Sequence, residues 1–232
     1  MKILIVEKGR SIEKRNCPKR KTKVCVGCKP CSITTGFAGA GAFSDGKLSL
    51  SPDVGGTLPE ILGYEKTIEL LKEADDIYLK FGADTKIYGL DDYESIERIR
   101  AKAIRANLKL IECPIRHLGT EEGYKIYTRL QEHLLEKGVE IKFMTMVKNL
   151  IVEDGTVKGI VTDKDEEYFA PEIVTGVGRE GSEWFSNICK EHDIQTKNGT
   201  VDVGVRVEVR DEIMKELNEK LYEAKLVYYT PT

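Results

Sequence analysis

The alternation of helical and strand-like segments is the feature that most constrains how this chain can fold. Apolar residues recur at helical spacing in three stretches, at residues 64–82, 92–108 and 121–138. Segments rich in β-branched or alternating residues lie at residues 2–6, 109–117, 139–176, 201–209 and 225–232. Helices that alternate with strands in this way predict an α/β protein with a partly parallel sheet.

Residues 147–169 predict an antiparallel β-ribbon within this pattern. Two strand-like stretches flank Asp154 and Gly155, a dipeptide that favours the type I′ turn of a tight hairpin. A second turn near residues 163–165 is followed by a predicted strand that ends at Gly176. A helix is expected to begin directly afterwards, and the tail of the chain predicts strand, helix and strand.

Composition excludes several classes of protein. A chain of 232 residues is long enough for one large domain or two small ones. Hydrophobic residues make up 41% and charged residues 32%, which indicates a folded globular protein rather than a disordered one. A formal net charge of −3 argues against a dedicated nucleic-acid binder. The basic run at residues 14–23 has no aromatic residues, so we interpret it as a solvated loop rather than a phosphate-binding patch.

The chain shows no sign of membrane insertion or secretion. No apolar stretch approaches the length of a membrane span, and residues 1–6 are too short for the apolar core of a signal peptide. We therefore expect a cytoplasmic protein without a membrane partner. Structural disulfides are unusual in the cytoplasm, so the six cysteines call for another explanation.

The first strand and the acid that follows it are typical of a ligand-binding site. Residues 2–6 are followed by an acid, Glu7, and by a turn-forming residue, Gly9. This order is typical of the second strand of a dinucleotide-binding βαβ unit, in which the acid bonds the adenosine ribose. Such a unit needs an earlier strand and a glycine-rich loop, and only Met1 precedes this strand.

Two further segments expose backbone groups to a ligand. In "GFAGAGAFSDGKL", residues 36–48, four glycines and three small alanines would let a flat or charged ligand approach the peptide N–H groups. In "EIVTGVGREGSEW", residues 172–184, a strand would end where a helix begins, and helix N-termini favour phosphate. A tightly packed loop and an ordinary strand-to-helix connection are the alternatives.

These segments together resemble one flavoprotein family. "ILIVEKG", "GFAGAGAFSDGKL", "IRHLGTE", "VKNLIVEDGTVKGIVT" and "GVGREGSEW" are similar to the uncharacterised FAD-dependent dehydrogenases, which are NAD(P)/FAD-dependent oxidoreductases with a Rossmann-type FAD domain. The resemblance covers nearly the whole chain. It implies hydride or electron transfer through flavin, an unknown small-molecule substrate, and NAD(P)H as a candidate electron partner.

The resemblance also implies the cofactor site. Glu7 would bond the FAD ribose, residues 39–47 would follow the pyrophosphate towards the isoalloxazine, and Val147 would meet the adenine through its backbone. Gly178 and Arg179 would close on the flavin end. The implied cofactor-binding residues are Glu7, Lys8, Gly39, Ala40, Gly41, Ala42, Phe43, Ser44, Asp45, Gly46, Lys47, Val147, Gly178 and Arg179.

The chain departs from the family at both ends. Members begin with a strand and a GxGxxG turn and continue beyond the point where this sequence stops, so we expect an internal segment of a longer flavoprotein. The fold would be an incomplete Rossmann-type FAD-binding domain with a helical insertion. The expected parts are the first part of the FAD domain at 1–50, the insertion at 51–118, the second part with the β-ribbon at 119–182, and the start of a substrate-side domain at 183–232. Without the phosphate loop we expect weak FAD binding, because each charge-assisted bond contributes about 1.5–3 kcal/mol.

Four cysteines suggest an alternative function. Cys17, Cys25, Cys28 and Cys31 follow a C-x7-C-x2-C-x2-C spacing, and four thiolates suit zinc or an iron–sulfur cluster. The other interpretations are exposed reduced thiols or a redox-active pair. The alternative to a flavoenzyme is therefore a non-enzymatic metal-binding protein in which the four cysteines hold zinc.

The three histidines suggest no complete acid–base constellation. His133 and His192 are expected at surface or capping positions, and Cys113 and Cys189 in the core. His117 follows Arg116 near the expected flavin site, where a proton donor would be useful, although a loop histidine that bonds a carbonyl is the commoner case. No catalytic residue is therefore assigned, and a chain without activity of its own remains a further alternative.

Overall fold

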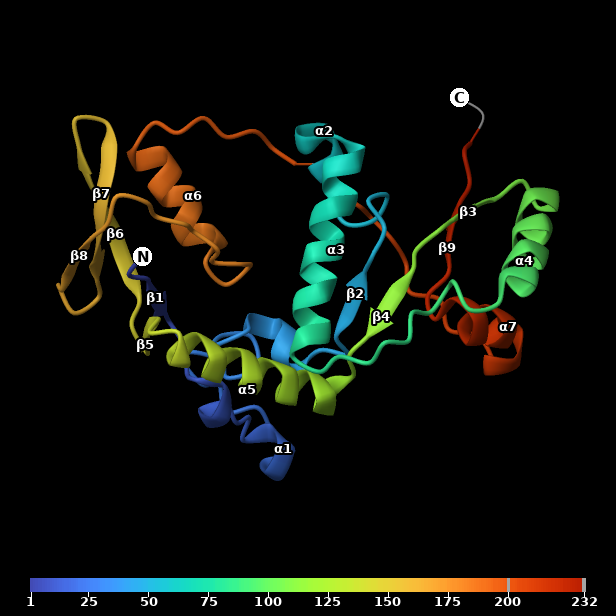
Figure 1. The fold of residues 1–232 in the computed structure, drawn as a ribbon, viewed down its shortest axis with the longest axis horizontal. Coiled ribbons are helices and arrows are strands. Elements are labelled where there is room, and N and C mark those ends of the chain that lie inside the picture. The colour runs from blue at the N-terminus through green and yellow to red at the C-terminus, as the bar shows by residue number, and fades with distance from the viewer. Residues whose placement is uncertain (200, 231–232) are drawn as a thin grey trace. The chain divides into compact units, whose positions relative to one another are not determined.

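The computed structural model describes residues 1–199 and 201–230 as a mixed α/β protein with seven α-helices and several small sheets. The described chain divides into two compact units, each built from two stretches of sequence. Unit 1 holds Met1–Phe43 and Tyr127–Val203, and unit 2 holds Ser44–Ile126 and Gly204–Thr232. The border falls inside helix α5 (Thr120–Glu136), which Figure 1 labels.

A parallel pair of strands forms the centre of unit 1. Strand β1 (Leu4–Glu7) pairs with β5 (Glu140–Phe143), with Leu4 opposite Glu140 and Glu7 opposite Phe143. Helix α5 leads into β5, and Gly138, two residues after the helix ends, has a φ of 79°, which is typical of the residues that follow a helix C-terminus. Glu7 therefore stands at the carboxyl end of a parallel pair, as the sequence predicts.

The predicted β-ribbon is confirmed. Strands β6 (Val147–Glu153), β7 (Thr156–Thr162) and β8 (Glu167–Phe169) form one antiparallel sheet. The first hairpin turns at Asp154 and Gly155, whose φ values of 49° and 71° are both positive, as a type I′ turn demands. Helix α6 (Ser182–Glu191) lies beside the ribbon in Figure 1, and the indole of Trp184 donates to the Lys148 carbonyl at 3.0 Å.

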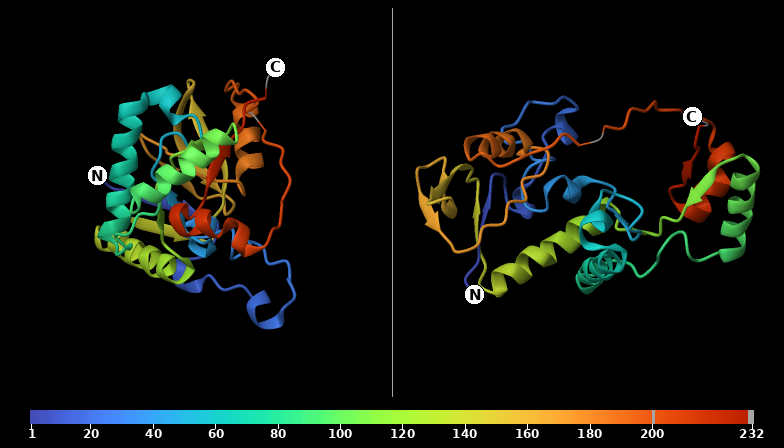
Figure 2. Two further views of the ribbon diagram at one scale, coloured as in Figure 1. Left: turned by 90° about the vertical axis from the view of Figure 1, so that its right-hand side faces the viewer. Right: turned by 90° about the horizontal axis from the view of Figure 1, so that it is seen from above.

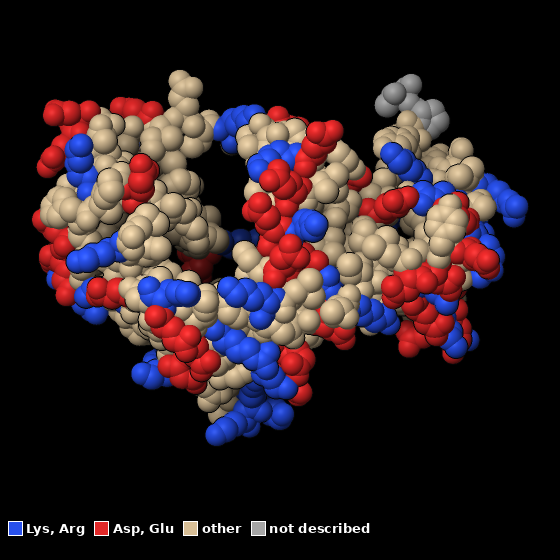
Figure 3. Space-filling model, in the orientation of Figure 1, with Lys and Arg blue, Asp and Glu red and all other residues tan. Residues whose placement is uncertain are grey.

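Unit 1 also contains the basic run and its short helix. Helix α1 (Lys19–Thr22) is a single turn, and the glycine-rich segment forms a 3-10 helix at Gly39–Phe43. The cationic side chains of residues 19–23 are exposed, and Figure 3 shows them as a blue area where Figure 1 places α1.

Unit 2 contains two antiparallel strand pairs and four helices. The strands are β2 (Lys47–Ser49) with β4 (Ile115–His117), and β3 (Lys109–Ile111) with β9 (Lys225–Val227). The helices are α2 (Leu58–Leu62), α3 (Tyr64–Lys80), α4 (Tyr93–Arg105) and α7 (Asp211–Leu221). Helices α4 and α7 lie beside the β3–β9 pair (Figure 2).

The apolar core of unit 2 joins these helices to the sheet. Its buried members are Ile96, Ile99, Ala103, Leu110 and Leu221. The Asp92 carboxylate accepts the backbone N–H of Ser95 at 3.0 Å and caps α4. The apolar stripe of α4, which contains Ile96, Ile99 and Ala103, faces this core. The helix predicted at residues 92–108 therefore forms for the expected reason.

Two predicted strands do not form in the described residues. Residues 172–176 have no strand pairing, so the expected strand-to-helix switch point is wrong, although α6 does begin at Ser182. Residues 201–209 form no strand pairing either, and Val205 is 89% exposed. A strand needs a neighbour for its backbone groups, and neither segment finds one here. The last residues of the expected final strand, 231–232, lie outside the described part.

The strands of the described residues make four sheets of two or three strands each. The single, partly parallel sheet is thus not formed, and an incomplete Rossmann-type domain stays a prediction. Within the described residues, no helix is both long and apolar enough to cross a membrane.

Candidate functional site

The carboxyl end of β1 is held in a defined shape by its own acid. One oxygen of the Glu7 carboxylate, Oε1, accepts the backbone N–H of Gly9 at 2.7 Å. The carbonyl of Gly9 accepts the N–H of Met144 at 2.8 Å, and the carbonyl of Glu7 accepts that of Thr145 at 3.1 Å. The chain leaving β1 therefore continues beside the chain leaving β5, and Glu7 stays half-buried at this end.

The glycine-rich segment closes on the same end of β1. The N–H of Phe37 donates to the Arg10 carbonyl at 3.0 Å, next to a β-bridge between Arg10 and Gly36. A Cβ atom on Gly9 would lie only 2.4 Å from the backbone nitrogen of Gly36. Glycine at position 9 is thus required for the two backbones to touch.

A buried arginine holds this segment in place. Arg15 is 4% exposed and donates to the carbonyls of Ser32 at 3.0 Å, Ile33 at 2.7 Å and Phe37 at 2.5 Å. Its guanidinium also lies over the Phe43 ring, 4.8 Å from the centroid. Burial lowers the pKa of Arg15, while the charge of Glu7 acts in the opposite direction.

Sequence reasoning missed Arg15. Arg15 lies within the basic run at residues 14–23, which we interpreted as a solvated loop. Nothing in the sequence distinguishes Arg15, which is buried, from the other cationic residues of the run. Its N–H groups donate to backbone carbonyls, so Arg15 fixes the shape of the site and does not bind a ligand through these groups.

The segment after Arg15 contains five of the implied cofactor residues of unit 1, Gly39 to Phe43. Gly39 and Ala38 have φ values of 55° and 65°, so the chain takes a left-handed course before the 3-10 helix Gly39–Phe43. A Cβ atom on Gly41 would lie 3.3 Å from the Tyr127 hydroxyl oxygen. Ala40 is exposed and Ala42 is buried. Close packing of Gly41 against the Tyr127 side chain therefore accounts for part of the small-residue pattern.

Besides Glu7, the other implied residues of unit 1 are Lys8, Val147, Gly178 and Arg179. The Lys8 ammonium pairs with the Glu180 carboxylate at 3.0 Å, which ties the turn at Gly178 and Arg179 to the end of β1. The guanidinium of Arg179 is exposed and has no hydrogen bond or ion pair with the described residues. Val147 begins β6 and pairs with Thr162.

The remaining implied residues belong to unit 2, where they face β4. The carbonyls of Asp45 and Gly46 accept the N–H groups of Gly119 at 3.0 Å and Leu118 at 2.7 Å. The Ser44 hydroxyl oxygen accepts the N–H of Gly46 at 3.1 Å. Residues 44–47 thus form a turn that leads into β2, with Lys47 opposite His117.

This turn brings three polar side chains together. Nε2 of His117 lies 2.8 Å from Oδ1 of Asp45, and the Tyr222 hydroxyl donates to Oδ2 of Asp45 at 2.6 Å. The rings of His117 and Tyr222 lie 4.8 Å apart. The hydrogen bonds from Tyr222 and then His117 lower the pKa of Asp45. Burial first, and the Asp45 carboxylate second, raise the pKa of Tyr222 to about 12.

The cluster is supported by the neighbouring residue on β4. Arg116 is buried, makes a two-pronged ion pair with Asp75, and donates to the carbonyl of Asp84. These contacts fix β4 against α3, so His117 projects from a rigid strand. Sequence reasoning identified Asp45 and His117 separately, but nothing in the sequence indicated that Tyr222 contacts them. Nothing in the sequence indicated the ion pair between Arg116 and Asp75 either.

The four cysteines are not assembled in the described chain. Cys25, Cys28 and Cys31 are exposed and Cys17 is half-buried. In residues 1–199 and 201–230, no group of three or more His, Cys, Asp or Glu side chains could hold a metal ion. Backbone N–H groups of Thr34 and Ile33 and the Thr34 hydroxyl lower the pKa of Cys31. Zinc or an iron–sulfur cluster at these cysteines stays a prediction that no contact favours.

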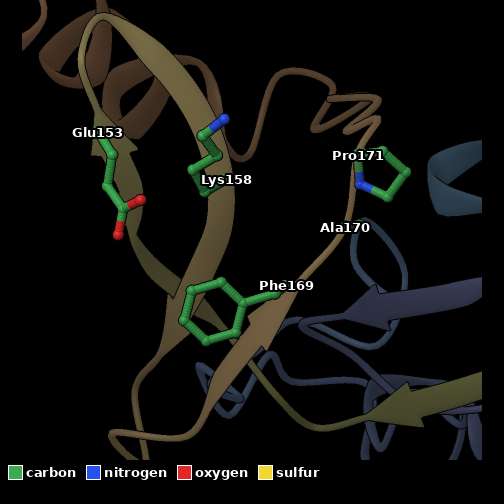
Figure 4. A pocket seen from close by; sticks show the side chains of 5 residues that line it. All are labelled: Glu153, Lys158, Phe169, Ala170 and Pro171. Atoms are coloured by element: carbon green, nitrogen blue, oxygen red, sulfur yellow. The ribbon is translucent and has the colours of Figure 1, made fainter.

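A shallow depression lies on the β-ribbon. Its lining is shown in Figure 4 and comprises Glu153, Lys158, Phe169, Ala170 and Pro171. It is open to solvent and includes none of the implied cofactor residues, so we assign it no role.

Known proteins provide no further identification. No protein-family model and no curated protein matches this chain. The functional proposal therefore rests on the geometry of this chain and on the resemblance described above.

Proposed function

We propose that this chain is part of an FAD-dependent oxidoreductase and contributes part of a Rossmann-type FAD-binding domain. The observation that carries the proposal is the closure of the glycine-rich segment on the carboxyl end of β1, through Gly9 and Gly36. Ligands of α/β proteins bind beyond the carboxyl ends of parallel strands, where short glycine turns leave backbone groups accessible.

Glu7 fits the ribose of a dinucleotide. Its Oε1 is already occupied by the N–H of Gly9, which fixes the direction of the carboxylate. Its Oε2 has no hydrogen-bond partner among the described residues. An ionised carboxylate accepts hydrogen bonds only, and the hydroxyls of a ribose are the donors that would match it.

The turn at residues 178–180 fits the anionic part of the cofactor. The Lys8–Glu180 ion pair holds this turn beside Glu7, and Arg179 adds a guanidinium with no anionic partner in the described chain. Arginine binds phosphate oxygens in a two-pronged manner, so a pyrophosphate is a suitable partner for Arg179.

The roles of the remaining residues follow from the resemblance. Residues 39–47 would run along the pyrophosphate towards the isoalloxazine, and Val147 would contact the adenine through its backbone. FAD would supply hydride or electron transfer when bound, while the chain supplies position and charge. NAD(P)H is the candidate electron partner that the family resemblance suggests.

The gene provides the first test. The proposal predicts that in-frame codons before Met1 encode a β-branched strand, a GxGxxG turn and a helix that leads into Lys2. The protein with those residues should purify with visible flavin absorbance. A stop codon there, or an extended protein that takes up no FAD, would contradict the proposal.

Replacing Glu7 provides the second test. Glu7→Gln keeps an oxygen for the N–H of Gly9 but removes the charge, and we expect FAD to bind the extended protein about tenfold to a hundredfold more weakly. Glu140→Gln is the matched control, because Glu140 is exposed at the opposite end of the same strand pair. Titration of flavin fluorescence measures both. Equal losses in the two variants would count against a ribose contact at Glu7.

A further inference from the structure

The turn after Cys31, within unit 1, gathers hydrogen-bond donors on one sulfur atom. The backbone N–H groups of Thr34 and Ile33 and the Thr34 hydroxyl all donate to Sγ of Cys31. The N–H of Thr35 donates to the Cys31 carbonyl at 2.9 Å and closes the turn. Donors at a sulfur favour the thiolate, because the anion is a stronger acceptor than the thiol. Cys31 is also exposed, so a reactant can reach this sulfur from solvent.

Arg15 holds the two peptide groups that carry these backbone donors. Its guanidinium donates to the carbonyls of Ser32 at 3.0 Å and Ile33 at 2.7 Å. Those carbonyls belong to the same peptide units as the N–H groups of Ile33 and Thr34, and both units are trans. The C=O and N–H of a trans peptide point in opposite directions, so the N–H groups point away from Arg15. The buried cation also polarises both peptides, which strengthens them as donors to Cys31.

Cys28 supplies a second thiol at the spacing that suits a redox pair. It lies three positions before Cys31, and a C-x2-C spacing is typical of cysteines that exchange disulfides. Cys28 is exposed and has no hydrogen-bond partner among the described residues. One sulfur of the pair is therefore held by donors and the other is not. Thiol–disulfide exchange uses this difference, because one thiolate attacks and a second thiol resolves the mixed disulfide.

The charge around the pair suits an anionic reactant. Residues 14–43 contain seven Lys and Arg and no Asp or Glu, and six of the seven cations are exposed. One of them, Lys29, lies between the two cysteines in sequence. The charge of Glu180 opposes the thiolate of Cys31, but the Glu180 carboxylate pairs with Lys8 at 3.0 Å. A negatively charged reactant would therefore be attracted to this segment.

We propose that Cys31 and Cys28 form a thiol–disulfide exchange site, in which Cys31 attacks the disulfide of a small anionic thiol compound and Cys28 resolves the mixed disulfide. This activity goes beyond the proposed function and does not depend on it, because no step uses FAD.

The exchange balances without a further reactant. Cys31 gives its proton to water, and its thiolate attacks one sulfur of the external disulfide. The S–S bond breaks, and the leaving thiolate takes a proton from water. Cys28 then loses its proton and attacks Sγ of Cys31, which forms the Cys28–Cys31 disulfide and releases the second external thiol. The two cysteines are oxidised, and the external disulfide is reduced to two thiols.

The first test compares the nucleophilicity of the cysteines. The whole chain is reduced and treated with limiting iodoacetamide near neutral pH, and fragmentation mass spectrometry identifies the labelled sulfur. Cys31 should react about fivefold or more faster than Cys25, which is equally exposed but has no hydrogen-bond partner among the described residues. Thr34→Val removes the hydroxyl donor and keeps the shape of the side chain. It should slow Cys31 about twofold to threefold and leave Cys25 unchanged.

The second test follows the exchange with oxidised glutathione as the probe. The unaltered chain should form the Cys28–Cys31 disulfide and release both halves of the probe as thiols. Cys28→Ser should stop at a mixed disulfide on Cys31, whereas Cys25→Ser should behave as the unaltered chain does. High salt should slow the reaction about threefold, but should not slow the reaction with the neutral hydroxyethyl disulfide. Circular dichroism checks that the variants remain folded.

Four results would overturn the proposal. Equal alkylation of Cys25 and Cys31 would remove the role of the backbone donors. A mixed disulfide that persists on the unaltered chain, or a disulfide between other cysteines, would remove the role of Cys28. A reaction with glutathione that salt does not change would exclude the anionic class of reactant. Stoichiometric zinc or iron in the chain as purified, with cysteines that react only after chelation, would assign them to a metal instead. FAD binding or its absence bears only on the flavoprotein proposal.

Discussion

Two regions of this chain hold a side chain with ring or guanidinium nitrogens in opposite ways. Arg15 in unit 1 is 4% exposed and donates only to backbone carbonyls, whereas the side chain of His117 in unit 2 is 27% exposed and meets only side chains. The first arrangement builds a backbone shape for a ligand to contact. The second leaves one ring nitrogen, Nδ1, without a hydrogen-bond partner among the described residues. Burial and the type of partner therefore distinguish a side chain that shapes the backbone from one that keeps an unpaired nitrogen.

The largest expected effect comes from removing the scaffold cation. Arg15→Ala leaves the carbonyls of Ser32, Ile33 and Phe37 without their charged donors, so we expect the free energy of unfolding to fall by about 3–4 kcal/mol. Urea unfolding followed by fluorescence of the one tryptophan, Trp184, reports on unit 1.

Arg20→Ala is the matched control for Arg15. The Arg20 guanidinium also lies over the Phe43 ring, at 5.1 Å, but its side chain is exposed, so its removal should cost no more than about 1 kcal/mol. Similar losses in both variants would mean that the contact with Phe43, and not the carbonyl bonds, carries the stability of this segment.

The glycine contact at β1 gives the next largest effect. Gly9→Ala places a Cβ atom 2.4 Å from the nitrogen of Gly36, and backbone must move to relieve the clash, so we expect a loss of about 2–3 kcal/mol. Gly123→Ala is the control, because a Cβ atom there meets nothing within 4 Å and lies in helix α5, where alanine should stabilise by up to about 1 kcal/mol. A neutral Gly9→Ala would show that the two backbones do not touch.

The side-chain cluster predicts an effect at high pH. The pKa of Tyr222 is raised to about 12, so the folded state holds this proton more tightly than the unfolded state. The stability that this gives is complete below a pH of about 10 and is lost as the pH rises from about 10 to about 12. Asp45→Asn removes the second cause and leaves burial, so the pKa of Tyr222 should fall towards 10 without reaching it.

Ultraviolet titration measures this pKa, with the curve of the matching Tyr222→Phe protein subtracted to remove the other nine tyrosines. An unchanged midpoint in Asp45→Asn would mean that burial alone raises the pKa, and that Asp45 is not held by Tyr222.

Much of the local structure was predictable because it depends on neighbours in sequence. The turn at Asp154 and Gly155 needs two residues with positive φ, and helix α4 needs a cap and an apolar stripe, which are all visible in the sequence. The acid at the end of β1 and the glycine-rich segment could also be identified from the sequence, because each is defined by neighbouring residues. A glycine that must accept a neighbouring backbone cannot be replaced without cost, so its presence carries information.

Other features depend on partners that the sequence does not specify. Residues 201–209 alternate more strictly than β6 or β7, yet of these segments only β6 and β7 pair with each other in the described chain, because a two-residue turn joins them. Tyr222 reaches Asp45 across 177 positions, and no periodicity links them. Arg15 and Asp75 are buried, whereas the pattern of apolar and polar residues predicts that charged residues such as these lie at the surface. A pattern indicates which face of a segment is apolar, and only tertiary contacts decide what covers it.

The smallest expected effect concerns an ion pair next to Tyr222. Lys47 and Glu223 lie 2.6 Å apart, but their side chains are 42% and 56% exposed, so water and salt screen the pair. Glu223→Gln should therefore change the free energy of unfolding by no more than about 0.5 kcal/mol, and less at high salt. The hydrogen bond from Lys47 to Glu223 raises the pKa of Lys47, so the variant should lower it, which a proton NMR titration of the Lys47 side chain detects. A loss of more than about 1 kcal/mol would mean that this exposed ion pair stabilises the fold as strongly as a buried contact does. Exposure would then not explain the difference between Lys47 and Arg15.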